Sequence, residues 1–230
     1  MKAIPLFSLE LRRLLLSRLT WLIALLTLLS PLAGLTLYKP ANAGTMLSMY
    51  LANPALAGGA AGGVLFGLLA VFELDRANRC RVDVLVDAAV SPLRMALVRL
   101  LALMSAAALT LCLAMLVWLP VSRGLIGAVF DGAEYLLAYA LFMGLALPLG
   151  ILAASSAYQF ARRADLSLVA LAVFAGLSLS VWADDWQLCW LNPCVWALSD
   201  DFSNFRIFRS VAWMSLTWLA ALTGVWVLSW

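Results

Sequence analysis

The 230-residue sequence contains no histidine, and charged side chains make up only 12% of it. The absence of histidine excludes Ser–His and Cys–His nucleophile pairs, histidine metal sites and histidine-ligated haem. No G-x-x-x-x-G-K-[ST] string is present, so the chain has no P-loop for nucleotide hydrolysis. We therefore expect a chain that is not an enzyme and holds no metal or cofactor of its own. The four cysteines show no C-x-x-C spacing and are Cys80, Cys112, Cys189 and Cys194.

Apolar residues dominate instead. They make up 65% of the chain, and the mean hydropathy is +1.01. Soluble domains carry roughly 25% charged residues, about twice the share found here. This composition predicts an integral membrane protein that forms a single transmembrane domain over residues 1–230. The net charge of +3 is too small and too dispersed to indicate a nucleic-acid partner.

Six apolar stretches have the length of about 20 residues that a membrane-crossing helix needs. Long continuous runs of this kind indicate helices rather than barrel strands, because a helix satisfies its own backbone in lipid. The sequence therefore predicts an all-α, polytopic bundle of about six transmembrane helices. The expected spans are Thr20–Tyr38, Met46–Phe72, Met95–Leu119 (ended by Pro120), Glu134–Tyr158, Leu166–Trp182 and Ser210–Trp230.

The N-terminal segment 1–19 mixes leucines with Arg12, Arg13 and Arg18, which predicts a helix lying partly in the membrane interface. Basic residues before an apolar run are also typical of a signal peptide. We favour a retained first span, because the small-residue string at 41–43 follows a Pro-containing loop. The inner segments would hold eleven of the fifteen Lys and Arg residues, so both termini are expected to be cytoplasmic, in a cell (inner or plasma) membrane.

The loop 73–94, between the second and third spans, is the most informative segment. Arg79, Asp83 and Asp87 recur every four residues, and an apolar face runs opposite them through Leu85. Ser91 and Pro92 end the pattern. The segment predicts a short amphipathic helix on the cytoplasmic side. It would either rest on lipid headgroups or dock into a cytoplasmic protein, and its paired carboxylates favour docking.

This order of elements resembles the membrane subunit of a type-2 ABC exporter. The matching positions lie in the string FELDRANRCRVDVLVDAAVSPLRMALVRLLALM and are Glu73, Leu85, Ser91, Pro92 and Arg99. The string lacks the Gly-Thr pair often found in that family's loop. The resemblance implies that the loop is a coupling helix seated in a separate cytoplasmic ATPase, which binds ATP and Mg²⁺. It also implies a second permease subunit, identical or different. Coupling residues would be Glu73, Arg79, Asp83, Leu85, Asp87 and Pro92.

Two further groups have alternative interpretations. Small residues let helices approach closely in lipid, so the second-span glycines indicate packing within the bundle or a subunit interface. These are Gly58, Gly59, Gly62, Gly63 and Gly67. The segment 183–208 is expected to form an outer helical segment before the last span. Its aromatic and acidic residues indicate an interfacial belt or a vestibule for an amphiphilic cargo. They include Trp182, Trp186, Trp190, Asp184 and Asp185, and Cys189 and Cys194 would be placed to form a disulfide there.

Three other classes of protein are weighed against the exporter permease. A six-span substrate-capture subunit of a vitamin-type importer has a similar size, but it docks through its spans rather than through a charged loop helix. An intramembrane enzyme needs clustered catalytic groups, which the absence of histidine disfavours. A membrane scaffold or assembly factor stays open.

Overall fold

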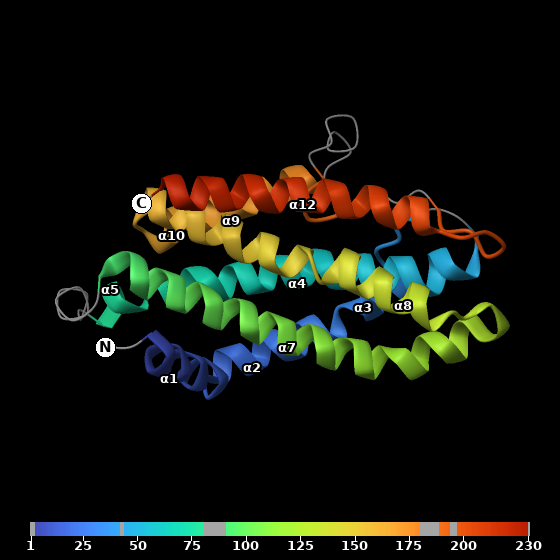
Figure 1. Cartoon of the computed structure of the whole chain (residues 1–230), viewed down its shortest axis with the longest axis horizontal. Coiled ribbons are helices and arrows are strands. Elements are labelled where there is room, and N and C mark those ends of the chain that lie inside the picture. Colours follow the sequence, from blue (N-terminus) through green and yellow to red (C-terminus); the bar gives the residue numbers. More distant parts are fainter. Residues whose placement is uncertain (1–2, 42–43, 81–90, 180–188, 194–196, 230) are drawn as a thin grey trace.

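The computed structural model describes residues 3–41, 44–80, 91–179, 189–193 and 197–229, and all its regular elements in those ranges are helices (Figure 1). Large apolar side chains such as Leu116, Val169 and Trp213 cover its outer surface. Soluble proteins rarely expose contiguous apolar surface on this scale. The predicted all-α membrane fold is therefore confirmed. Five stretches are long and apolar enough to cross a membrane: Arg18–Thr36, Ser48–Leu74, Pro92–Val129, Gly132–Ala161 and Phe205–Leu228.

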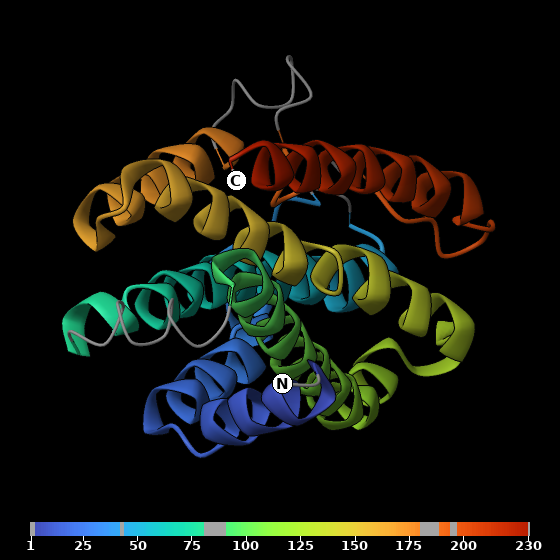
Figure 2. The same ribbon diagram turned by 60° about the vertical axis from the view of Figure 1, so that its left-hand side comes forward.

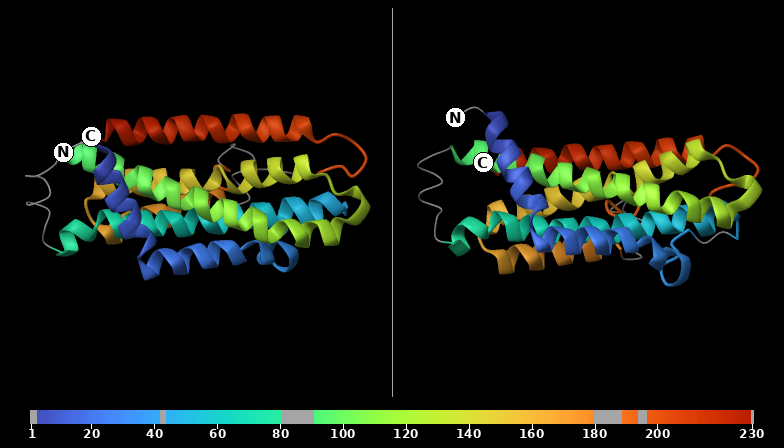
Figure 3. Two further views of the ribbon diagram at one scale, coloured as in Figure 1. Left: turned by 60° about the horizontal axis from the view of Figure 1, so that its bottom comes forward. Right: turned by 90° about the horizontal axis from the view of Figure 1, so that it is seen from below.

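Helix α1 (Ala3–Leu15) is the predicted N-terminal helix. It lies obliquely across one end of the bundle and packs against α7 (Figure 3). The first span follows as α2 (Arg18–Leu29) and α3 (Pro31–Thr36). The break between them falls at Pro31, which has no backbone N–H to continue the helical hydrogen bonds.

Two long helices form the centre of the bundle. The first is a π-helical turn η1 (Ser48–Ala52) followed by α4 (Asn53–Leu74), and the second runs through α8 (Gly132–Ala138), η3 (Tyr139–Met143) and α9 (Ala146–Ala161). The turn η1 ends two residues before Pro54, which has no backbone N–H to continue the helical hydrogen bonds. The turn η3 ends five residues before Pro148.

Helices α4 and α9 make backbone-to-backbone contact where they cross (Figure 2). A Cβ atom added to Gly150 would lie 2.0 Å from the carbonyl oxygen of Gly63, and one added to Gly59 would lie 2.2 Å from that of Phe142. Only glycine fits at such distances. The other second-span glycines also face atoms of this chain, so all five are packing positions within the bundle. Their neighbours include Met143 at Gly58, Leu147 at Gly62 and Leu171 at Gly67.

The third span is longer than predicted. Helix α7 runs from Pro92 to Ile126 with Pro120 inside it, and a short 3-10 turn η2 (Gly127–Val129) follows. The prediction that Pro120 closes this span was wrong. The helix ends instead at Gly127, whose φ of +66° is accessible to glycine and unfavourable for other residues.

The fifth predicted span, Leu166–Trp182, is not a full crossing helix in the described residues. Helix α10 (Ala164–Ser178) has 15 residues, or roughly 22 Å at the helical rise, which falls short of a hydrocarbon core of about 30 Å. The next described residues, 189–193 and 197–204, form no helix. Leu191 lies beside Gly63 at the middle of α4. The Leu198 N–H donates to Ser48 Oγ at the end of the bundle remote from the termini. Helix α12 (Phe205–Leu228) then returns to the starting end, so both termini lie there (Figure 1).

The outer helical segment predicted over 183–208 is not helical at residues 189–193 and 197–204, whereas residues 205–208 already belong to α12. Buried polar contacts replace helical bonds there. The Leu191 N–H donates to Ser178 Oγ, and the Trp190 indole N–H donates to the Phe174 carbonyl. Non-helical backbone is tolerated at membrane depth when protein satisfies it in this way.

At the end of the bundle remote from the termini, residues 197–204 bond the N-terminal ends of the helices that begin near Met46, Glu134 and Phe205. Asp200 accepts hydrogen bonds from the Met46 and Leu47 N–H groups at 2.8 and 2.9 Å. The Asn204 amide donates to both carboxylate oxygens of Glu134 at 3.2 Å. Contacts between residues 70 and about 150 positions apart in the chain therefore connect the helices at this end of the bundle.

We expect replacement of Asp200 by alanine to lower the free energy of unfolding by about 1–2 kcal/mol, because two backbone donors lose their acceptor. Its neighbour Asp201 is exposed and serves as the matched control, with Asp201→Ala expected to leave stability unchanged. Thermal unfolding of the detergent-purified protein measures both. Equal effects of the two substitutions would contradict the assigned role of Asp200.

Candidate functional site

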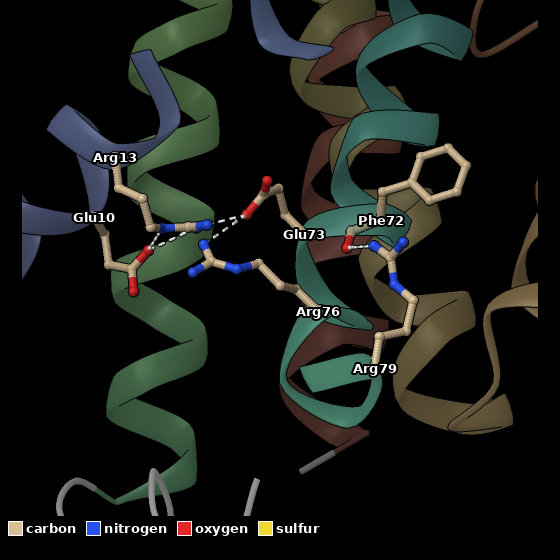
Figure 4. A network of polar contacts seen from close by, with 6 residues as sticks. All are labelled: Glu10, Arg13, Phe72, Glu73, Arg76 and Arg79. Atoms are coloured by element: carbon tan, nitrogen blue, oxygen red, sulfur yellow. Dashed lines mark hydrogen bonds and ion pairs between the residues drawn. The ribbon is translucent and has the colours of Figure 1, made fainter. Parts of the chain in front are cut away.

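A cluster of charged residues lies where α4 ends, at the end of the bundle that holds both termini (Figure 4). Its centre is Glu73, the last acidic residue of the second span, which is only 8% exposed. A carboxylate so nearly enclosed by apolar helices needs a counter-charge, because burial of an unpaired charge is costly. The surrounding residues come from α1 and from the short helix α5 (Arg76–Cys80).

Arg13 of α1 supplies the counter-charge. Its Nη2 lies 2.5 Å from Glu73 Oε2, and its Nε donates to Glu10 Oε2 at 2.7 Å. Arg76 Nη1 lies 4.0 Å from Glu73 on the more exposed side. Figure 4 shows Arg13 between the two carboxylates. One guanidinium therefore joins α1 to the end of α4 across 60 residues of sequence.

A second group of contacts fixes α5 on the end of α4. Arg79 Nη2 donates to the Phe72 carbonyl at 2.7 Å, and its guanidinium carbon lies 5.5 Å from the Phe72 ring centroid. Arg79 Nε lies 3.3 Å from Asp75 Oδ2, while the Tyr158 hydroxyl of α9 donates to Asp75 Oδ1 at 3.1 Å. The start of the loop is thus bound to both central helices.

The electrostatics of this end follow from its burial. Burial of Arg13 alone would lower the pKa of its guanidinium, but the hydrogen bond and charge of Glu73, with those of Glu10, outweigh it and raise that pKa. A cavity of about 10 Å³, large enough for one water molecule, lies among Glu10, Arg13, Glu73 and Arg99. Within the described residues, Arg99 Nε is buried without a hydrogen-bond partner.

The structure places three of the predicted coupling residues. Glu73 and Arg79 belong to the cluster, and Pro92 is the first residue of α7. Asp83, Leu85 and Asp87 lie outside the described residues. Sequence analysis missed Glu10, Arg13, Asp75 and Tyr158 as partners. The three-residue spacing of Glu10 and Arg13 was one available signal, because such a pair shares a helix face.

Of the residues predicted for the outer vestibule and disulfide, the structure describes only Cys189 and Trp190. Trp190 is 1% exposed and stacks on Phe174 at 4.6 Å, so it lies inside the bundle rather than on an outer surface. Cys189 is also buried, with its Sγ 3.8 Å from Met214 Sδ. The other residues of that prediction lie outside the described ranges, namely Trp182, Asp184, Asp185, Trp186 and Cys194.

Among the residues that the structure describes, no group of three or more Cys, Asp or Glu side chains is placed to hold a metal ion. No family model, curated protein or solved structure matches the chain. The fold and the apolar surface define a polytopic helical membrane protein, and any finer assignment depends on the ionic cluster and on the loop that leaves it.

Proposed function

We propose that this chain is the permease subunit of a type-2 ABC exporter, driven by a separate cytoplasmic ATPase. The supporting observation is the Arg13–Glu73 ion pair, which ties the oblique α1 to the end of α4 where the loop 73–94 begins. A loop that pushes on a rigidly connected end can move several helices together. A loop connected to the bundle only through its two covalent ends would not transmit its movement to α1.

In this proposal ATP and Mg²⁺ act on the partner ATPase, which supplies the energy by hydrolysis. The loop helix carrying Asp83, Leu85 and Asp87 would seat in the ATPase. Movement of the loop would reach α5, where Arg79 binds Asp75 and Phe72, and then pass through Glu73 to α1 and α4. Such rigid-body movement of packed helices is an established way to switch a transport pathway.

The Lys and Arg distribution supports an orientation of the protein in a cell membrane. The end that holds the ionic cluster also holds both termini, so the positive-inside bias would place that whole end in the cytoplasm. A second permease subunit, identical or different, would complete the pathway. The cargo would be hydrophobic or amphiphilic, because the spans offer few polar groups for a hydrophilic solute.

Co-purification tests the proposal. The protein, extracted in a mild detergent from its native membrane, is expected to bring down a soluble P-loop ATPase. Asp83→Lys combined with Asp87→Lys is expected to abolish this recovery, because charge reversal opposes docking. The matched control is Asp165→Lys, at the exposed start of α10 beside Arg163, which should leave recovery unchanged.

Two outcomes would overturn the proposal. Recovery of the permease alone with a bound small molecule would favour the vitamin-type capture subunit. Recovery of a partner without nucleotide-binding motifs would favour the scaffold or assembly factor.

A further inference from the structure

A groove in the bundle surface lies between the first span and α4, at the half of the protein remote from the ionic cluster. Its volume is about 530 Å³, within the range of roughly 300–1,000 Å³ typical of small-molecule sites. Leu26, Ser30 and Tyr38 line one side, Ala57 and Ala61 line the other, and Leu179 at the end of α10 lies at its edge.

The lining of the groove is almost entirely apolar. On the α4 side three alanines, at 57, 60 and 61, leave the surface hollow, and Val64 and Leu65 line the part beyond them. The Ser30 hydroxyl donates to the Thr27 carbonyl, so its hydrogen is already used within the helix. Ser30 therefore offers a solute only an acceptor, whereas a hydrocarbon chain needs no hydrogen bond and fits the apolar lining.

The groove follows the second half of the first span. Leu26 lies in α2, and Tyr38 lies just beyond the end of α3, where its N–H donates back to the Ala33 carbonyl. The groove thus extends from the middle of the first span to the end of that span remote from the ionic cluster.

A cation stands at the surface end. Lys39 follows Tyr38 directly and is exposed, and no ion pair involves it among the described residues. A lysine at this level attracts lipid phosphate. An apolar groove suits an acyl chain, and the exposed lysine next to its lining residue Tyr38 suits a lipid phosphate.

We propose that the groove between the first span and α4 binds one acyl chain of a phospholipid from the leaflet remote from the ionic cluster, with the lipid phosphate beside Lys39. A second copy of this chain would instead need to offer a ridge that fills a concave surface. The site requires no ATPase, so its test is independent of the proposed exporter function.

The test uses the protein in phosphatidylcholine nanodiscs containing phosphatidylglycerol with a nitroxide on one acyl chain. Electron paramagnetic resonance then measures the motionally restricted fraction of the labelled lipid. We expect Ala61→Phe, which fills the groove, to lower that fraction by the share of a single lipid per protein relative to the unmodified protein. The matched control is Ala108→Phe, on the exposed face of α7, which should leave the fraction unchanged.

A second variant keeps the test independent of folding. Lys39→Gln is expected to remove the preference for phosphatidylglycerol over labelled phosphatidylcholine while the groove stays intact. An unchanged restricted fraction in Ala61→Phe, with unfolding temperature preserved, would overturn the proposal. A loss of dimer in Ala61→Phe without a change in restricted lipid would also overturn it, in favour of a second copy.

Discussion

Replacement of Gly150 by alanine is expected to destabilise the bundle by about 3 kcal/mol, among the larger effects of a single added methyl group. The added Cβ would lie 2.0 Å from the carbonyl oxygen of Gly63. The oxygen belongs to the backbone and the backbone fixes the position of the Cβ, so neither atom rotates away as a side-chain end would. The α4–α9 crossing must separate, and among the described helices this is the most extensive contact.

Gly176 in α10 provides the control, because a Cβ added there meets nothing within 4 Å. Gly176→Ala should be neutral or slightly stabilising, since alanine favours helix over glycine by roughly 0.8–1 kcal/mol. The two variants are compared by thermal unfolding in the same detergent. If Gly150→Ala unfolded at the temperature of Gly176→Ala, the close crossing of α4 and α9 would be refuted.

The second large effect concerns Arg13 and Glu73. Glu73→Gln is expected to cost about 2 kcal/mol, because it leaves the half-buried guanidinium with Glu10 as its only close carboxylate. Arg13→Gln should cost a similar amount. The double variant should cost clearly less than the sum, which gives a coupling energy of about 1–2 kcal/mol in a double-mutant cycle.

The Arg163–Asp165 pair is the control for that cycle. Its atoms are 2.8 Å apart, yet its side chains are 68% and 62% exposed. Exposed pairs contribute little, because water and salt screen them. Asp165→Asn is therefore expected to produce no measurable change. Additive effects of Arg13→Gln and Glu73→Gln would show that the 2.5 Å contact does not couple α1 to α4.

The sequence predicted the helices well where one long apolar run forms each element. It failed at Pro120, because proline ends a helix only if its lost hydrogen bond and ring cannot be accommodated, and α7 accommodates both. It also failed at the fifth span. Hydropathy measures how apolar a segment is, and it does not show that α10 ends at Ser178, whose Oγ accepts a hydrogen bond from the Leu191 N–H.

The ionic cluster was predictable only in part. Glu73 was identifiable as an acidic residue leaving an apolar run. Its partner, Arg13, lies 60 residues away, and no local pattern states which of four N-terminal cations reaches it. The second-span glycines predicted close packing, but their partners on α9 depend on the crossing of two helices, which the spacing alone does not specify.

Cross-linking from Cys80 tests the central claim most directly. This cysteine ends α5 and is exposed where the loop leaves the bundle. A membrane-impermeant maleimide carrying a photoreactive group is attached to Cys80 in inverted membrane vesicles, and the photoadduct is identified by mass spectrometry. The account predicts an adduct with a P-loop ATPase. Labelling of Cys80 from the exterior of intact cells, or an adduct that contains no ATPase, would contradict it.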